Sequence, residues 1–199
     1  MGLCIYYSGS FRNPALLPEM IEELKDISEE FKWDYHVYET EFPPSGFWKE
    51  GYNQKTYGIS LSPPECEPLW FSFLSNGRMS NFLHLEMWGK SKSGEERKFL
   101  YSLITKTQYA GIEVHKVIIH LFRHISEKYF TGFEMLDEGG YWESNDVKIL
   151  EENFRKYDYL IDSFAFALEN FPKSVDENLE DYLKRMFMKI HKNIQGKKF

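Results

Sequence analysis

The chain reads ISEEFKWDYHVYE over residues 27–39 and ISEKYFTGFEMLD over residues 125–137. At this offset of 98 residues the opening Ile-Ser-Glu is identical, and aromatic, apolar and acidic positions coincide further along. A glycine-aromatic-Trp triplet follows each stretch, at residues 46–48 and 140–142. The pattern predicts two copies of a helix that leads into a strand and then into a glycine-containing loop, although short self-matches also arise by chance.

This repeat organises the expected fold as one compact domain over residues 1–199. Candidate half-repeats cover residues 2–54 and 98–146, each with a strand, a helix and a strand. A C-terminal helical segment is expected over residues 146–195, where apolar side chains keep helical spacing. The expected fold class is therefore α+β, with a mixed β-sheet, two strand-helix-strand units, a central antiparallel hairpin and two C-terminal helices.

The hairpin signal lies in the middle of the chain. Residues 69–74 and 79–88 have the composition of β-strands, and Asn76-Gly77 between them is a strong two-residue turn signal. We expect a turn of the primed type, in which both central residues have positive φ. One face of this hairpin would carry His84 and Glu86, which could project into an aromatic pocket or lie at the edge of a covered face.

Composition limits the classes of function. Hydrophobic residues make up 42% of the chain and charged residues 28%, as in globular proteins. The aromatic share of 18% is high, so we expect some Tyr and Trp rings at a pocket or contact surface. The net charge of −7 argues against nucleic-acid binding, because such binding needs Lys and Arg side chains opposite the phosphates.

Cysteine usage and hydropathy predict a location. Cys4 and Cys66 form neither a metal-ligand spacing nor a disulfide framework, and Cys66 lies between two glutamates that disfavour its thiolate. The first residues, MGLCIYYSG, lack the basic start and long apolar segment of a signal peptide. No apolar run is long enough to span a membrane. We therefore expect an acidic, aromatic-rich, cytoplasmic protein.

Parallel strands within each unit would bring four segments to one edge of the sheet. These segments are residues 8–12, the loop after Glu39, residues 105–108 and residues 137–143. Ligands of open α/β sheets bind at such an edge. The loops that contain Trp48 and Trp142 would there form an aromatic, negatively charged cleft that favours cationic or metal-bridged ligands.

The strongest candidate site is the loop Asp137-Glu138-Gly139-Gly140-Tyr141-Trp142-Glu143. Its three carboxylates could hold a divalent cation or serve as a general acid and base. The alternative is an ordinary strand-to-helix turn, because acidic residues are favoured near a helix N-terminus. No cofactor is identified and no metal ligand is assigned, with a divalent cation left open. The residues predicted to bind are Trp48, Asp137, Glu138, Tyr141, Trp142, Glu143 and His84.

Two further groups of residues are weaker candidates. His115, His120 and His124 share one predicted helix, and the last two have zinc-binding spacing on one face. The Glu of the metalloprotease pattern and a third ligand are missing, so His120 and His124 are expected to flank the apolar stripe or to point outward. Residues 8–10 and Arg12 precede a predicted helix start, with Asn13 as the cap and Pro14 at the first helical position. They could hold an anion at this helix start, or could form a plain turn.

The last predicted helix is basic on one side. Of the 24 Lys and Arg residues, six lie in residues 184–199, where no acid occurs, so the preceding chain carries 18 basic and 31 acidic groups. Lys184, Arg185, Lys189 and Lys192 lie opposite the apolar side. Such a helix could dock on a membrane or an acidic partner, or it could be a solvated helix whose charges suit its dipole.

These patterns contain no complete catalytic signature. The leading hypothesis is a cytoplasmic, non-catalytic protein that binds a small molecule or another protein, with partner and oligomeric state unspecified. The alternative is a hydrolase-type enzyme that uses the acidic loop at residues 137–143, with or without a divalent metal. A third hypothesis is an adaptor that binds an acidic protein through its basic C-terminal helix.

Overall fold

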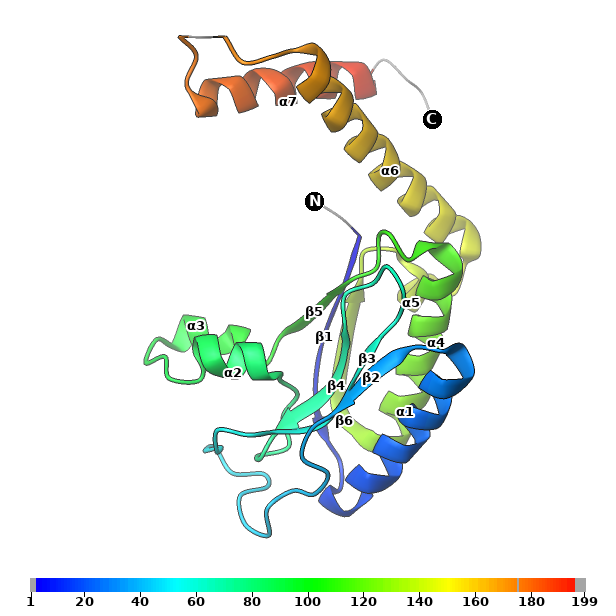
Figure 1. The fold of residues 1–199 in the computed structure, drawn as a ribbon, viewed down its shortest axis with the longest axis vertical. Helices are drawn as coiled ribbons and strands as arrows, with labels where there is room; N and C mark the ends of the chain where they lie inside the picture. The colour runs from blue at the N-terminus through cyan, green and yellow to red at the C-terminus, as the bar shows by residue number, and fades with distance from the viewer. Residues whose placement is uncertain (1–2, 175, 196–199) are drawn as a thin grey trace.

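The computed structural model describes residues 3–174 and 176–195. The elements follow in the order β1 (Cys4–Phe11), η1 (Pro14–Leu16), α1 (Leu17–Phe31), β2 (Asp34–Val37), β3 (Thr56–Ser62), β4 (Leu69–Leu74), α2 (Phe82–Trp88), α3 (Gly94–Phe99), β5 (Leu103–Lys106), α4 (Gly111–Tyr129), β6 (Phe130–Asp137), α5 (Tyr141–Ser144), α6 (Val147–Asn170) and α7 (Leu179–Gln195). Figure 1 shows the strands packed beside α1 and α4, with α6 leading away to α7.

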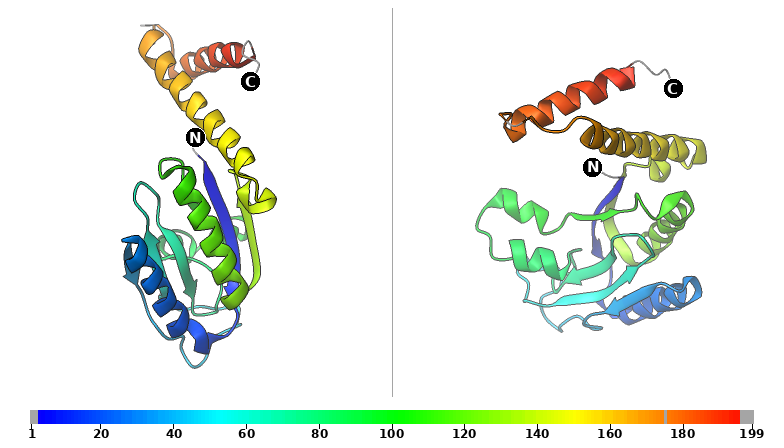
Figure 2. Two further views of the ribbon diagram at one scale, coloured as in Figure 1. Left: turned by 90° about the vertical axis from the view of Figure 1, so that its right-hand side faces the viewer. Right: turned by 45° about the horizontal axis from the view of Figure 1, so that its top comes forward.

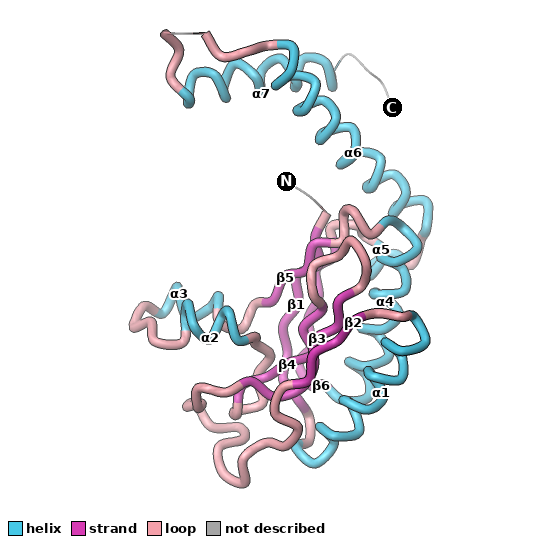
Figure 3. The backbone as a smooth tube through the Cα atoms, in the orientation of Figure 1, coloured by secondary structure: helices cyan, strands magenta, loops and turns pink. Residues whose placement is uncertain are grey.

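The strands form two three-stranded sheets, ordered β5-β1-β6 and β2-β3-β4. Each neighbouring pair of these strands is antiparallel. Helices lie beside the sheets and two helices end the described chain, as the tube in Figure 3 shows. The α+β class predicted from the sequence is therefore confirmed.

The two predicted units differ in how their strands pair. β1 and β2 belong to different sheets, whereas β5 and β6 flank β1 within one sheet. Because both flanking strands are antiparallel to β1, they run in the same direction without pairing with each other. Parallel strands within one sheet were expected in both units; the second unit has them, while the first does not, because β1 and β2 lie in different sheets. The turns from helix to strand also differ, since α1 is followed by Lys32 in the left-handed conformation, whereas α4 continues directly into β6 through the extended Phe130.

A short return segment, residues 77–79, joins the two sheets. It bridges β4 at Phe73↔Met79 and β1 at Ser10↔Arg78. The Phe11 amide donates to the Gly77 carbonyl at 2.7 Å, and the Met79 amide donates to the Gly9 carbonyl at 2.9 Å. The core consequently runs through both sheets without interruption.

The helices α1 and α4 lie side by side along this core (Figure 2). Phe122 of α4 is fully buried where the sheets meet, with ring centroids 4.6 Å from Tyr7 of β1 and 4.7 Å from Phe71 of β4. At the start of the first helical segment, the Asn13 side chain accepts a hydrogen bond from the Ala15 amide. The predicted helix start at Asn13-Pro14 is thereby confirmed.

The predicted hairpin is only partly formed. Its loop has three residues instead of two, since the Leu74 amide donates to the Arg78 carbonyl and the Gly77 amide donates to the Leu74 carbonyl. Gly77 has φ of +82°, while Asn76 is not among the residues with positive φ. The primed turn is therefore wrong, and the geometry is that of a type I turn followed by a left-handed glycine.

The second predicted strand of the hairpin is a helix. Residues 82–88 form α2, and the Asn81 side chain caps it by accepting the His84 amide at 2.8 Å. Leu, His, Glu and Met in this segment are compatible with a helix, and the Asn81 cap stabilises the helix over a strand. His84 and Glu86 consequently lie on a helix and not on the face of a sheet.

Replacing Gly77 with valine is expected to lower the free energy of unfolding by about 1–3 kcal/mol, because the residue must keep positive φ. A Cβ atom there would also lie 2.7 Å from the Phe47 ring. Urea denaturation followed by circular dichroism measures the change. The control is Gly94→Val, where a Cβ meets no atom within 4 Å. Equal midpoints for the two variants would contradict the strain at Gly77.

One face of the β5-β1-β6 sheet is open. Tyr6 of β1 pairs with Ile104 on one side and Leu136 on the other, and these last two side chains are 39% and 61% exposed. The opposite face carries the buried Ile5 and Tyr7. Antiparallel sheets commonly leave one face to solvent, so this apolar row is available for contact.

Helix α6 belongs to the body at its start and leaves it further along. Leu150 and Phe154 are buried in the main core, whereas Ala167 is buried against Tyr182 and Met186 of α7 in a separate cluster. We call α6 from Tyr157 onward, together with α7, the arm; it extends beyond the sheets in Figure 1. No helix in the described part of the chain is long and apolar enough to cross a membrane.

Candidate functional site

The acidic loop surrounds one buried carboxylate, Asp137, which ends β6 and is 4% exposed. It accepts hydrogen bonds from the amides of Gly139 at 2.7 Å, Tyr141 at 2.8 Å and Trp142 at 3.1 Å. Burial acts to raise the pKa of Asp137, but His115 and these amides outweigh burial and hold the pKa below its usual value. The carboxylate thus fixes the turn from β6 into α5.

A buried chain of polar groups continues from Asp137 into α4. The His115 Nε2 atom lies 3.2 Å from the Asp137 carboxylate, and its Nδ1 atom lies 2.8 Å from the Thr107 hydroxyl. At Asp137 the imidazole N–H is the donor, because an ionised carboxylate only accepts hydrogen bonds. The chain ties the end of β5, the start of α4 and the acidic loop together.

A hydroxyl, an imidazole and a carboxylate in this order resemble the chain of groups that activates nucleophiles in hydrolases. Thr107 and His115, however, have no exposed surface. A substrate could reach the Thr107 hydroxyl only if this part of the protein unfolded. The arrangement observed here therefore positions backbone segments.

The other carboxylates of the loop also contact backbone amides. Glu138 accepts from the Cys4 amide at 2.8 Å, and Glu143 accepts from the Asp137 amide at 3.3 Å. Among the described residues, no group of three or more His, Cys, Asp or Glu side chains is placed to hold a metal ion. Taken together, these contacts are those of a strand-to-helix turn, and the role of this loop in binding stays a prediction.

The chain's own Arg123 contacts the two aromatic rings of this loop. Its guanidinium carbon lies 5.7 Å from the Tyr141 ring centroid and 5.5 Å from that of Trp142. The same guanidinium donates to the Tyr141 carbonyl at 3.0 Å and the Trp142 carbonyl at 2.9 Å. A cationic ligand at these rings would have to compete with Arg123.

The structure does not bring the other predicted binding residues to this loop. Asp137 pairs with Ile5 near the start of β1, whereas the Trp48 amide donates to the Asn76 carbonyl beside the return segment that meets Phe11. Six residues of extended strand separate these ends by about 20 Å. The single shared edge expected from the repeat is therefore not formed.

His84 and Trp48 each have a separate environment. His84 lies on α2, where burial lowers the pKa of its imidazole despite nearby backbone groups of Phe99 and Leu100. Trp48 is 57% exposed, has φ of +62° and packs edge-on against Phe47. The seven predicted residues therefore lie in three separate places: the acidic loop, α2 and the loop that contains Trp48.

The weaker candidates also have assigned contacts. His120 contacts the Tyr141 hydroxyl and His124 contacts Glu23, so the two imidazoles do not converge. The Arg12 guanidinium donates to the carbonyls of Glu127 and Phe130 at the end of α4, which leaves it directed at backbone oxygen. Burial, followed by the charge of Glu67, raises the pKa of the Cys66 thiol to about 12.

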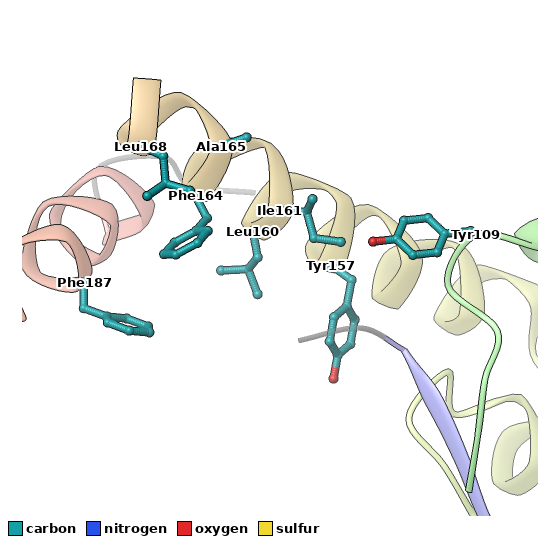
Figure 4. Close-up of a pocket in the computed structure, with 8 residues that line it drawn as sticks. All are labelled: Tyr109, Tyr157, Leu160, Ile161, Phe164, Ala165, Leu168 and Phe187. Carbon is teal, nitrogen blue, oxygen red and sulfur yellow. The ribbon is translucent and has the colours of Figure 1, made fainter. Parts of the chain in front are cut away.

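An open apolar concavity lies along the arm (Figure 4). This groove has a volume of about 380 Å³ and is bordered by Tyr109 at the body and Phe187 of α7. Its floor is one side of α6: Tyr157, Leu160, Ile161, Phe164, Ala165 and Leu168. We call it the arm groove. Its walls are apolar except for the two tyrosine hydroxyls near the body.

Charges of the arm are partly paired within it. Lys184 contacts Glu180 at 2.7 Å, and Arg185 contacts Glu177 at 2.8 Å. The side chains of Lys189 and Lys192 lie outside the described residues, so the predicted basic face is described at its first half only. That half is neutralised by the acidic start of the same segment.

No protein-family model, no curated protein and no solved structure matches this chain.

The sequence reasoning missed two features. The zinc spacing draws attention to His120 and His124 and not to His115, whose spacing from Ile118 and Phe122 places it on the buried side of α4. The arm groove was also missed, because the apolar spacing of α6 predicts a buried face along its whole length. Spacing alone does not reveal where the covering body ends.

Proposed function

We propose that this chain is a non-catalytic interaction protein of the cytoplasm and that the arm groove is its binding surface. The observation that carries the proposal is an open apolar groove of about 380 Å³ on a helical arm that leaves the body. Grooves of this size lined by apolar and aromatic side chains are typical binding sites. Apolar helices commonly bind in such grooves.

The polar groups of the body support a non-catalytic role. The Thr107–His115–Asp137 chain is buried, and the loop carboxylates already accept hydrogen bonds from amides. By contrast, Leu168 is 44% exposed and Phe187 52% exposed at the arm groove. Exposed apolar side chains that gather around a concavity are typical of a contact surface, whereas single scattered ones are common on any protein.

The test is binding of an environment-sensitive apolar dye to dilute full-length protein. We expect dye fluorescence to rise with the wild type and to fall several-fold with Leu160→Glu, which puts a charge into the groove. The matched control is Phe166→Glu: Phe166 is 58% exposed, and by helical spacing it lies on the opposite side of α6. Thermal unfolding of each variant checks that it stays folded. Equal fluorescence from all three proteins would remove the groove as a binding surface.

A further inference from the structure

We infer that the occupant of the arm groove is the arm of a second copy of this chain, so that two chains join through their α6–α7 hairpins. This inference rests on the proposed function of the groove. It assigns the partner from three features of the arm: an apolar ridge beside the groove, the two-fold compatibility of ridge and groove, and the charge polarity of α7.

The first feature is the apolar ridge. One side of α7 packs on α6 through Tyr182, which is 7% exposed, and Met186, which is fully buried. Next to this side lie Leu183, which is partly buried, and Phe187, which is 52% exposed and borders the groove. Helix α7 therefore has more apolar surface than α6 can cover, and the excess stands beside the groove. A helix stabilises by burying such a face against another element.

The second feature is that ridge and groove lie on the same hairpin. A two-fold interface uses the same patch on both chains, so each chain must offer both the projecting and the receiving surface. Phe187 meets this condition, because it borders the groove and projects from α7. A two-fold operation would place the Leu183–Phe187 ridge of each chain over the α6 floor of the other. The product is a closed arrangement of four helices, a common solution for amphipathic hairpins.

The third feature is the charge polarity of α7 and its flanks. Residues 176–181 contain four acids and no base, whereas residues 184–198 contain six bases and no acid. Two copies of α7 related by a two-fold axis across the helix run antiparallel. Glu177 and Glu180 already pair with Arg185 and Lys184 of their own chain, which leaves a net charge of −2 over residues 176–185 and of +4 over residues 186–198. The antiparallel arrangement brings these unlike ends together, while a parallel arrangement would bring like charges together. The segment is thus complementary to itself in the antiparallel orientation.

The experiment is the mass of the full-length chain in solution, by light scattering during size exclusion over a range of concentrations. The wild type is expected to approach the mass of two chains as concentration rises. Phe187→Glu is expected to raise the dissociation constant about 30-fold or more, which equals the loss of about 2 kcal/mol for a central interface residue. Leu160→Glu tests the same groove from α6, in case one variant fails to fold.

The matched control is again Phe166→Glu, the same substitution at a similarly exposed Phe on the other side of α6, and it should keep the wild-type dissociation constant. A wild type with the mass of one chain at every concentration would overturn the inference, as would a Phe187→Glu variant that dimerises like the wild type. If the chain stays monomeric while the apolar dye binds and Leu160→Glu abolishes that binding, the second copy is wrong and the proposed function stands. If the chain stays monomeric and the dye does not bind, both fail.

Discussion

Replacing Asp137 with alanine is expected to lower the free energy of unfolding by about 3–5 kcal/mol, the typical result of removing one partner from a buried ionic network. The carboxylate accepts three backbone amides and faces the His115 imidazole, and its side chain is fully buried. Its removal leaves these donors without an acceptor where water has little access. Urea denaturation followed by far-ultraviolet circular dichroism measures the loss.

The control for this variant is Glu134→Gln, on the same strand with an exposed side chain. A surface substitution of this kind should change stability by no more than about 0.5 kcal/mol. If Asp137→Ala loses no more stability than this control, the carboxylate does not organise the turn, and its interactions with the three amides and His115 contribute little.

The pH dependence provides a second measurement at the same site. Because the folded pKa of Asp137 is lowered, the stability contributed by its ionised form is present above the unfolded pKa of about 3.9 and is lost as pH falls toward the lower folded value. Between about pH 5 and pH 2 the wild type should therefore lose stability more steeply than Asp137→Ala. Parallel pH profiles of the two proteins would contradict the lowered pKa.

The second large effect is expected at Gly58, in the centre strand of the β2-β3-β4 sheet. Gly58 has φ of +114°, and a Cβ atom there would lie 2.3 Å from the Phe71 carbonyl oxygen on β4. Gly58→Ala must therefore both adopt an unfavourable backbone conformation and push two paired strands apart. We expect a loss of about 3 kcal/mol or more in the free energy of unfolding.

The matched control is Gly94→Ala, at the first position of α3, where a Cβ meets no atom within 4 Å. Alanine is favoured over glycine in helices, so this control should be neutral or slightly stabilising. Chemical denaturation of the two variants in parallel gives the comparison. A Gly58→Ala protein as stable as Gly94→Ala would mean that the strands accommodate the methyl group without displacement.

Elements with strong local signals could be predicted from the sequence. The cap at Asn13, the stripe of α4 and the long stripe of α6 each follow from residue spacing, and the structure has helices at all three. Strand pairing could not be predicted, because β1 pairs with β5 and β6, about 100 residues or more further along the chain. Local patterns carry no information about such distant partners.

The candidate site could likewise be predicted from the sequence only in part. Asp137 stood out as an acid in a glycine-containing loop, but its partner His115 belongs to α4, 22 residues earlier in the chain. Residues 82–88 have a strand-like composition but form the helix α2, because the Asn81 side chain caps it by accepting a hydrogen bond from the His84 amide. The sequence thus indicates which side chains are unusual, while only the fold shows whether they meet a ligand or the backbone.

Helix α6 also acts as a rigid spacer. Its 24 residues span about 36 Å, and it is continuous from the buried Leu150 to the arm. Whatever binds at the far end is therefore held at a set distance and direction from the sheets, without a flexible joint between them. Two bodies coupled through their arms would stand apart, and the apolar row at Tyr6, Ile104 and Leu136 would remain accessible on each of them.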